Sequence, residues 1–289
     1  MAVAPALYVA APTLTPTRFG LVSAGDLVVP EDPRFVNGIQ FESNPSGPAK
    51  LAPTECEDPQ TRTVADGIEV IEAGPIIVYN GFTCRAVGVD ESEMLDRARK
   101  ALTGGEWAAV EKALPLMNDE TDILTTAAVP LVKGIGLLED HLTEQYGGVG
   151  VIHAPRHVAM FAAERRQIDV DAGRKVTALG TRWSFGNYPN TDAAGAPAAV
   201  DTAWLVATGA VQVRRGDVKQ RPTSFAEAFN YATNEIQAIA ERTYVVSWEA
   251  VQAAVLVNLA PSAGQPATQQ SFYPGPDTLP GADLLPEGN

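Results

Sequence analysis

The chain has 289 residues, of which 45% are hydrophobic and 19% charged, as in globular rather than disordered proteins. Its 35 acidic and 21 basic residues give a formal net charge of −14, and the phosphate backbone repels such a chain, so sequence-specific binding of DNA or RNA is disfavoured. A repulsive wall does suit a container in which packed nucleic acid slides, although solubility is the more general reason for acidity. No stretch approaches the roughly 18 consecutive apolar residues of a membrane-spanning helix, so no membrane association is expected.

Its 25 glycines and 22 prolines predict many turns and long ordered loops rather than compact helical packing. The two cysteines, Cys56 and Cys84, are too few and too widely spaced for a disulfide framework or a four-ligand zinc site. We expect both to be free, buried thiols in a reducing cytoplasm.

The first 60 residues carry nine prolines, which leave no room for a helix of ordinary length. Only two short stretches, 20–29 and 35–41, have the character of strands. Residues 1–11 are apolar but lack the positive charge that begins a secretory signal, so we interpret them as an arm that packs on a neighbouring subunit or another surface. Such a turn-rich segment cannot bury enough surface to fold alone, and its ordering by partners favours an assembly.

Strand character returns over residues 68–89. Two apolar runs, 76–79 and 82–87, flank Asn80-Gly81, and Asn-Gly between apolar runs is the strongest short signal for a β-hairpin. The sequence therefore predicts a hairpin at this point, with a simple bend as the alternative.

The clearest helix is predicted over residues 91–114. Asp90 can cap its first turn, in which acidic residues complement the helix dipole. Apolar residues then recur at helical spacing as far as Pro115, which cannot continue the helix. Gly104-Gly105 interrupts this spacing and predicts a bend or a split in the helix.

The rest of the chain alternates short helices and strands. Helices are predicted over 129–145, ended by Gly147-Gly148, and over 155–166, with Pro155 in the first position. Further short elements are expected as follows: strands at 149–153, 175–179, 182–185, 203–207 and 210–214, a weak helix at 226–230, and two strands around Trp248-Glu249 within 241–259. Residues 261–289 hold six prolines and no Lys or Arg, which predicts an extended or disordered tail.

No motif for metal binding or nucleophilic catalysis is complete. His153 and His157 have the spacing of two ligands on one helix face, but Pro155 between them is expected to start the helix, which would leave His153 before it. Apart from Glu164, no nearby residue completes a ligand set. The nearest approach to a Gly-x-Ser-x-Gly turn, around Ser184, lacks the first glycine.

Cofactor motifs and charged pairs give no site either. The glycines at 147–150 precede a strand, whereas a dinucleotide fingerprint follows one. Acidic pairs such as Glu139-Asp140 and Asp169/Asp171 could do acid–base chemistry, but among 35 acidic residues they are expected by chance, on solvated faces. Three basic pairs are interpreted as subunit-contact charges rather than a nucleic-acid patch: Arg97/Arg99, Arg165-Arg166 and Arg214-Arg215. The sequence thus predicts no catalytic residue, cofactor or metal ligand, and no enzyme.

The order of elements resembles the major capsid proteins of tailed bacteriophages, whose Hong Kong 97-type fold is shared with encapsulins. In that family an N-terminal arm and an extended loop precede a long spine helix, and an axial domain is inserted before the chain returns to the peripheral domain. The stretch 105–111, Gly-Glu-Trp-Ala-Ala-Val-Glu, is similar to a Glu-x-x-Ala-hydrophobic stretch often found in the spine helix. Residues 240–257, a charged Glu-Arg strand before an apolar one, resemble the closing strands.

The resemblance covers most of the chain but is one of element order, without a diagnostic motif. It implies an α+β fold with these parts: an arm at 1–19, an extended β loop at 20–75, a peripheral domain at 76–119 and 206–260 with the spine helix at 91–114, an axial domain at 120–205, and an extended C-terminal tail at 261–289. The interrupted spine helix and the long acidic tail depart from the simplest family pattern. No crosslinking residue is transferred.

The function that the resemblance implies is self-assembly, through hexamers and pentamers, into the icosahedral head shell that encloses phage double-stranded DNA. Such a protein assembles in the cytoplasm of the host bacterium and ends in the virion, with scaffold, portal and decoration proteins as candidate partners. Three alternatives stay open: another virion part such as a decoration or connector protein, an encapsulin-like compartment shell, and, least favoured, an α/β enzyme with an unrecognised site.

Overall fold

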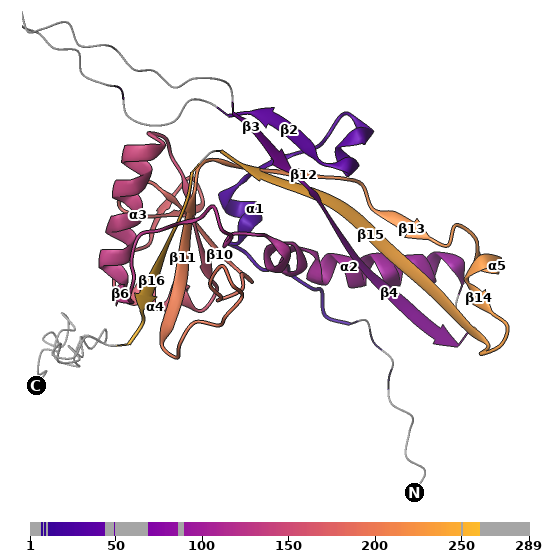
Figure 1. Ribbon diagram of the computed structural model, residues 1–289. Coiled ribbons are helices and arrows are strands. Elements are labelled where there is room, and N and C mark those ends of the chain that lie inside the picture. Colours follow the sequence, from indigo (N-terminus) through magenta and orange to yellow (C-terminus); the bar gives the residue numbers. More distant parts are fainter. Residues whose placement is uncertain are drawn as a thin grey trace, which may run out of the picture. The chain divides into compact units, whose positions relative to one another are not determined.

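A computed structural model of the chain describes residues 7, 9, 11–43, 49, 69–85, 90–249 and 251–260. The chain divides after Leu259, and the first unit, Met1–Leu259, holds every helix and strand described. The first unit combines helices with two large sheets and a two-stranded ribbon, so the predicted α+β class is confirmed (Figure 1). Cys56 and the predicted tail at 261–289 lie outside the described residues.

The centre of a six-stranded sheet is its longest strand, β15 (Glu235–Trp248). One edge of β15 pairs antiparallel with β4 (Pro75–Arg85) over eleven residue pairs, from Glu235 opposite Arg85 to Val245 opposite Pro75. Three short strands pair with the other edge of β15: β12 (Val211–Arg215), β13 (Lys219–Arg221) and β14 (Phe229–Asn230). A fourth strand, β1 (Asp26–Val28), pairs with β12 and so extends the sheet. The sheet therefore joins segments from both ends and the middle of the chain.

The longest helix, α2 (Glu91–Ala113), packs against β4 and β15 (Figure 1). Its first turn is capped as predicted, because Asp90 Oδ1 accepts a hydrogen bond from the Glu93 N–H at 2.8 Å. The helix continues through Gly104-Gly105, so the predicted split is wrong. It ends before Pro115, which disfavours helical backbone at the preceding residue.

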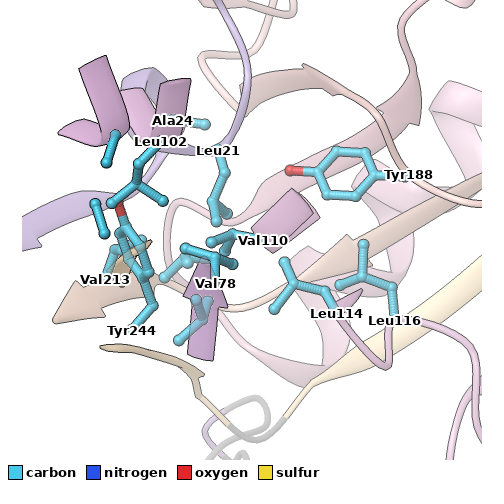
Figure 2. Packing of buried hydrophobic residues seen from close by; sticks show 14 of the residues in the cluster. Leu21, Ala24, Val78, Leu102, Val110, Leu114, Leu116, Tyr188, Val213 and Tyr244 are labelled. Carbon is cyan, nitrogen blue, oxygen red and sulfur yellow. The ribbon is translucent and has the colours of Figure 1, made fainter. Parts of the chain in front are cut away.

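One apolar core joins this helix to the sheet and to the short helix α1 (Leu21–Ala24). Figure 2 shows Leu21, Leu102 and Val110 close to Val78 and Tyr244. All five are at most 6% exposed. Apolar burial of this kind stabilises by about 25 cal/mol per Å² of area removed from water, so the helix and the sheet depend on each other for stability.

The second large sheet has eight strands. Its centre runs in the order β16 (Gln252–Asn258), β11 (Thr202–Thr208), β7 (Val151–Pro155) and β10 (Arg182–Gly186). Its edges are β5 (Asp122–Ile123) and β6 (Val129–Pro130) at one end, and β9 (Arg174–Val176) and β8 (Asp169–Asp171) at the other. All five residues of β7 are buried, which is the pattern of a strand covered on both faces.

Two helices pack on this second sheet. The helix α3 (Leu131–Gln145) contacts β16 and β11, and the shorter α4 (Val158–Glu164) contacts β7. The helix α3 stops where Gly147 takes a φ of 71° and donates its N–H to Leu142 O, so the predicted glycine stop is confirmed. Pro155 ends β7 instead of starting a helix, so that part of the prediction is wrong.

The remaining elements are small. A two-stranded ribbon consists of β2 (Ile39–Glu42) and β3 (Val70–Ala73), and the 3-10 helix η1 (Pro33–Asn37) precedes it. The helix α5 (Phe225–Ala228) leads into β14. The predicted strand at 20–29 is wrong in its first half, where α1 lies, and right in its second, where β1 pairs with β12.

The predicted hairpin at Asn80-Gly81 is also wrong, because β4 runs straight through both residues. The Asn80 side chain accepts the Gly81 N–H at 2.8 Å through Oδ1 and donates to Ala101 O of α2 at 2.9 Å through Nδ2. The eleven-pair ladder with β15 keeps the strand extended across the turn-favouring dipeptide. The long partner strand begins at Glu235, ahead of the predicted start near residue 241.

Candidate functional site

Strand alternation divides the side chains of β4 and β15 between two faces, and α2 packs on only one of them. The opposite side, here called the outer face, consists of Ile77 and Tyr79 of β4, Ile239 of β15, and Lys219 and Arg221 of β13. Pairing aligns these residues, since Tyr79 and Lys219 both lie opposite Glu241, and Ile239 lies opposite Gly81 and Arg221. Ile77 is 61% exposed and Tyr79 is 72% exposed.

Charges border the apolar side chains of the outer face. Arg221 Nε lies 3.4 Å from Glu241 Oε1, and 72% of the Arg221 side chain remains exposed. Exposed pairs of this kind add little to the stability of a subunit. A tyrosine and two isoleucines ringed by charge are instead the composition expected of a protein–protein contact.

A groove of about 1080 Å³ adjoins the outer face. Arg221, Gln237 and Ile239 belong to its lining, together with Phe229 and Tyr231 beyond α5. The two aromatic rings meet edge to face at 4.7 Å, and Tyr231 is 82% exposed. Polar side chains such as Thr223 and Asn230 share the lining with these rings, so the groove suits a polypeptide segment better than a small substrate.

The β2–β3 ribbon offers a second exposed surface. Its pairs Gln40–Glu72 and Glu42–Val70 place acidic side chains on one exposed face. Crevices of about 380 and 310 Å³ lie beside the ribbon. Gly38 at the base has a φ of 98°, a conformation that favours glycine, and a side chain there would strike Ala73 O at 2.8 Å.

The N-terminal arm is the third exposed surface. Residues 11–18 are all exposed, among them Leu14. A Cβ on Gly104 would lie 3.4 Å from the Leu14 side chain, so the arm passes along α2 at the glycine pair. The apolar residues Leu7 and Val9 are exposed as well. These exposed apolar side chains are available for contact with a partner surface.

A buried ion cluster braces α2 behind the outer face. Arg242 Nη1 donates to Glu106 Oε2 at 2.7 Å, and Arg215 Nη2 donates to Glu106 Oε1 at 3.1 Å. Only 2% of the Glu106 side chain is exposed. The Arg215 guanidinium also lies over the Trp107 ring, 5.6 Å from its centroid. These contacts fix the second half of α2 to β12 and β15.

The structure separates the two histidines with ligand-like spacing. His157 is exposed and directly precedes α4, whereas His153 is buried in β7. The His153 ring nitrogens lie 3.2 Å from Tyr188 Oη and 3.0 Å from Thr208 Oγ1. Burial lowers the pKa of His153 to about 3, so this ring is a neutral, hydrogen-bonded core residue.

Ser184 belongs to the same buried network. Its Oγ lies 2.5 Å from Tyr188 Oη, and its side chain has no exposed area. The cavity beside His153 and Tyr188 measures about 60 Å³, which is too small for a substrate. Burial raises the pKa of Tyr188 well above its usual range. The contacts among Ser184, Tyr188, His153 and Thr208 therefore link β10, β7 and β11.

Several charged residues that were predicted to lie on solvated faces or at subunit contacts instead make contacts within the subunit. Asp169 and Asp171 are exposed, but Glu139 is buried and accepts hydrogen bonds from Thr177 Oγ1 at 2.5 Å and Thr181 Oγ1 at 2.6 Å. Several arginines of the basic pairs make contacts within the subunit: Arg97 with Glu93, Arg165 with Leu259 O, Arg214 with Ser247, and Arg215 with Glu106.

The described part of the chain contains neither a cluster of potential metal ligands nor a helix that could cross a membrane. No group of three or more His, Cys, Asp or Glu residues there is placed to hold a metal ion. No helix among these residues is long and apolar enough to cross a bilayer. Cys84 is a half-buried free thiol.

Comparison with known proteins connects this architecture to capsids. No protein-family model matches the sequence, and no curated protein matches it significantly. Among solved structures, the capsid of a native GTA particle matches 89% of this chain and 95% of its own with a TM-score of 0.50 at 12% identity. The chain has the Hong Kong 97-type capsid fold. At such identity the likeness concerns the fold alone.

Two further capsid-fold structures are similar at somewhat lower scores. The capsid of Ralstonia phage GP4 matches 91% of this chain and 97% of its own at 7% identity, with a TM-score of 0.49. The SrpI encapsulin of Synechococcus elongatus PCC 7942 matches 89% and 94% at 10% identity, with a TM-score of 0.47. The capsid fold predicted from element order is confirmed by the match to the capsid of the GTA particle.

Proposed function

We propose that this chain is a major capsid protein, which self-assembles into the icosahedral head shell that encloses the double-stranded DNA of a bacteriophage. The observation that carries the proposal is the capsid fold over 89% of the chain, in a subunit that leaves an apolar sheet face, a ribbon and an arm exposed. Subunits of this kind assemble in the host cytoplasm and end in the virion.

The parts of the fold receive the following assignment. The peripheral domain comprises 76–119 and 206–260, with α2 as the spine helix, and the axial domain comprises 120–205. The arm at 1–19 and the extended loop at 20–75 lie over neighbouring copies, and 261–289 is a C-terminal extension. In this arrangement each subunit buries, against its neighbours, the outer face that it cannot cover by itself.

The stability of such a shell comes from many weak contacts between subunits. Each contact through the outer face, the ribbon or the arm is individually small, but a subunit in a shell engages several neighbours simultaneously. Hexamers and pentamers then require one sequence to fit two environments, and bends at residues such as Gly38 supply the adjustment. The net charge of −14 suits an inner wall along which packed DNA slides.

An encapsulin-like compartment shell and another virion part, such as a decoration or connector protein, are the alternatives within the structural class. Scaffold, portal and decoration proteins are the expected additional partners. An enzymatic role has less support, since the buried Ser184 network lies beside a cavity of only about 60 Å³.

Negative-stain electron microscopy with sedimentation velocity on the purified full-length chain tests the proposal. We expect closed particles, or rings of five or six subunits, and nuclease-protected DNA in particles isolated from infected cells. Particles that enclose a protein cargo and no DNA would favour the compartment. A monomer that binds preformed shells without forming any would favour a decoration protein.

A further inference from the structure

The exposed arm joins the body of the subunit at a tightly held point. Phe19 O accepts the Phe185 N–H of β10 at 2.7 Å, and Arg18 O accepts from Arg156 Nη1 at 3.1 Å. The Lys175 ammonium lies over the Phe19 ring, 5.0 Å from its centroid. Every one of these partners belongs to the segment proposed as the axial domain.

The central group at this point is the Glu111 carboxylate of α2. Its Oε1 accepts the Leu21 N–H at 2.9 Å, and its Oε2 accepts the Asn187 N–H at 2.7 Å. Glu111 is 6% exposed. One carboxylate thus joins the end of the arm, the spine helix and the chain leaving β10. We call the Glu111 carboxylate, the Arg156 guanidinium and the Phe185 N–H the arm clamp.

Two glycines make room for the carboxylate. A Cβ on Gly20 would lie 2.1 Å from Glu111 Oε1, and a Cβ on Gly186 would lie 2.6 Å from Glu111 Cδ. Any side chain at either position would displace the carboxylate from its two N–H donors. The sequence around the arm and around β10 therefore fits a glutamate held in this one place.

The backbone at the clamp is strained. Phe19 has a φ of 65°, in the left-handed region that residues other than glycine rarely adopt. Such a conformation persists only where the surrounding contacts fix it. Burial raises the pKa of Glu111, with the two N–H donors and the charge of Arg156 acting in the opposite direction. The backbone conformation of Phe19 and the buried carboxylate of Glu111 therefore both fix the point at which the arm joins the subunit.

We propose that Glu111 is a positioning residue for assembly: it fixes the direction in which the arm leaves the subunit, and so which neighbouring copy the arm reaches. The first half of this inference concerns the isolated subunit. The second half rests on the proposed function, because only a shell subunit has neighbours to select.

Limited trypsin digestion measures opening of the clamp, because Arg18 and Arg34 are the only basic residues before Lys50. Cleavage after Arg18 requires the arm and residues 19–21 to detach from the clamp, whereas cleavage after Arg34 does not. The ratio of the two cleavage rates, followed by mass spectrometry at early times, therefore reports opening at Arg18, and a destabilised control variant separates opening of the clamp from global unfolding.

Two variants open the clamp by different routes. Glu111→Gln keeps the shape of the side chain but turns an NH₂ group toward one of the two backbone donors, and Gly20→Ala keeps the carboxylate but displaces it. We expect both to raise the Arg18 to Arg34 cleavage ratio by about tenfold or more, because each breaks a buried hydrogen bond to a charged group. An unchanged ratio in both variants, with the native fold retained by circular dichroism, would overturn the inference.

Matched controls separate the clamp from general destabilisation. Lys112→Gln alters the next, exposed residue of α2 and should leave the ratio at the wild-type value. Glu106→Gln weakens the ion cluster elsewhere on α2 and should lower stability without raising the ratio. A ratio that rises equally in Glu106→Gln would show that loss of stability alone explains the cleavage.

Particle formation tests the second half. With the clamp open, we expect the purified variants to form irregular or open particles under conditions in which the wild type forms closed ones. Closed, regular particles from a variant whose cleavage ratio has risen would show that the clamp does not select the neighbour. Failure of the wild type itself to form particles would count against the proposed function, while the cleavage result would still decide the role of Glu111 within the subunit.

Discussion

The two large sheets of this subunit differ in how completely each is covered. In the eight-stranded sheet, β7 is buried along its whole length and α3 and α4 pack against the strands. In the six-stranded sheet, α2 packs on one face of β4 and β15, and Ile77 and Tyr79 on the other face are mostly exposed. The eight-stranded sheet is covered within one chain, and the six-stranded sheet leaves apolar side chains exposed on one face.

Under the proposed function, this contrast lets one region stabilise the folded subunit while the other contacts neighbouring copies. A protein that exposed both of its sheets would aggregate, and one that covered both would have no reason to assemble. Concentrating the uncovered surface on one region allows the other to stabilise the fold. The predictions below test this division by changing comparable residues in the two regions.

The largest effect on subunit stability is expected from Trp183→Ala in β10. Trp183 is 1% exposed and stacks on Phe185 with ring centroids 4.8 Å apart. Removal of a buried aromatic side chain costs about 3–5 kcal/mol of unfolding free energy. Urea unfolding followed by fluorescence measures the change. The matched control is Tyr79→Ala on the outer face, and an equal loss in the two variants would contradict the division.

The next effect is expected from Glu106→Gln, which leaves Arg242 without its charged partner. Only 11% of the Arg242 side chain is exposed, so the arginine cannot recover full hydration. Breaking such a buried pair costs about 3 kcal/mol or more of unfolding free energy. A loss below about 1 kcal/mol in the same urea experiment would show that the cluster does not brace α2.

A pH-dependent effect follows from His153. Its pKa is about 3 in the folded protein, against a usual value of 6.5, so the unfolded chain binds the proton more tightly between those values. Stability is therefore fully present above pH 6.5 and is lost as the pH falls toward 3. Between pH 7 and pH 5 the contribution is about 2 kcal/mol. His153→Gln should remove this part of the pH dependence; a variant with the same pH slope as the wild type would refute the assignment.

The smallest effect on subunit stability, and the largest on assembly, is expected from Ile77→Ser combined with Tyr79→Ser. Both side chains are mostly exposed, so the unfolding free energy should change by less than about 1 kcal/mol. Sedimentation velocity should nevertheless show loss of large particles. The control is Val170→Ser on β8, an exposed apolar residue outside the outer face, and equal loss of particles in this control would argue against a special role for the outer face.

The elements that could be predicted from the sequence are those whose structure depends on neighbouring residues in the chain. The Asp90 cap, the stop at Pro115 and the turn between two strands near Trp248 all depend on neighbours in the chain, and all were predicted. The hairpin at Asn80-Gly81 was predicted from an equally strong local signal and was wrong. Its outcome depended on β15, more than 150 residues away in the chain, which the local pattern does not contain.

The buried acids show a second limit of the sequence. Glu111 directly follows Val110 within α2, beside the apolar stripe of that helix, and Glu139 directly follows Leu138 in α3. A carboxylate at the border of an apolar stripe is a weak signal for burial, and that signal was available. What the sequence could not supply is the set of donors, since Leu21, Asn187, Thr177 and Thr181 come from distant segments. The outer face could not be predicted either, because the alternation of side chains along β4 does not show which of its two faces a helix covers.

The most direct test of this account is a cryo-electron microscopy reconstruction, at side-chain resolution, of particles formed by the purified chain. We predict a closed shell in which Ile77, Tyr79 and Ile239 of every copy lie against another copy, while the eight-stranded sheet keeps the packing described for the single subunit. Particles in which the outer face stays in solvent in every copy, or preparations that yield only monomers, would contradict the claim that this face is where subunits meet.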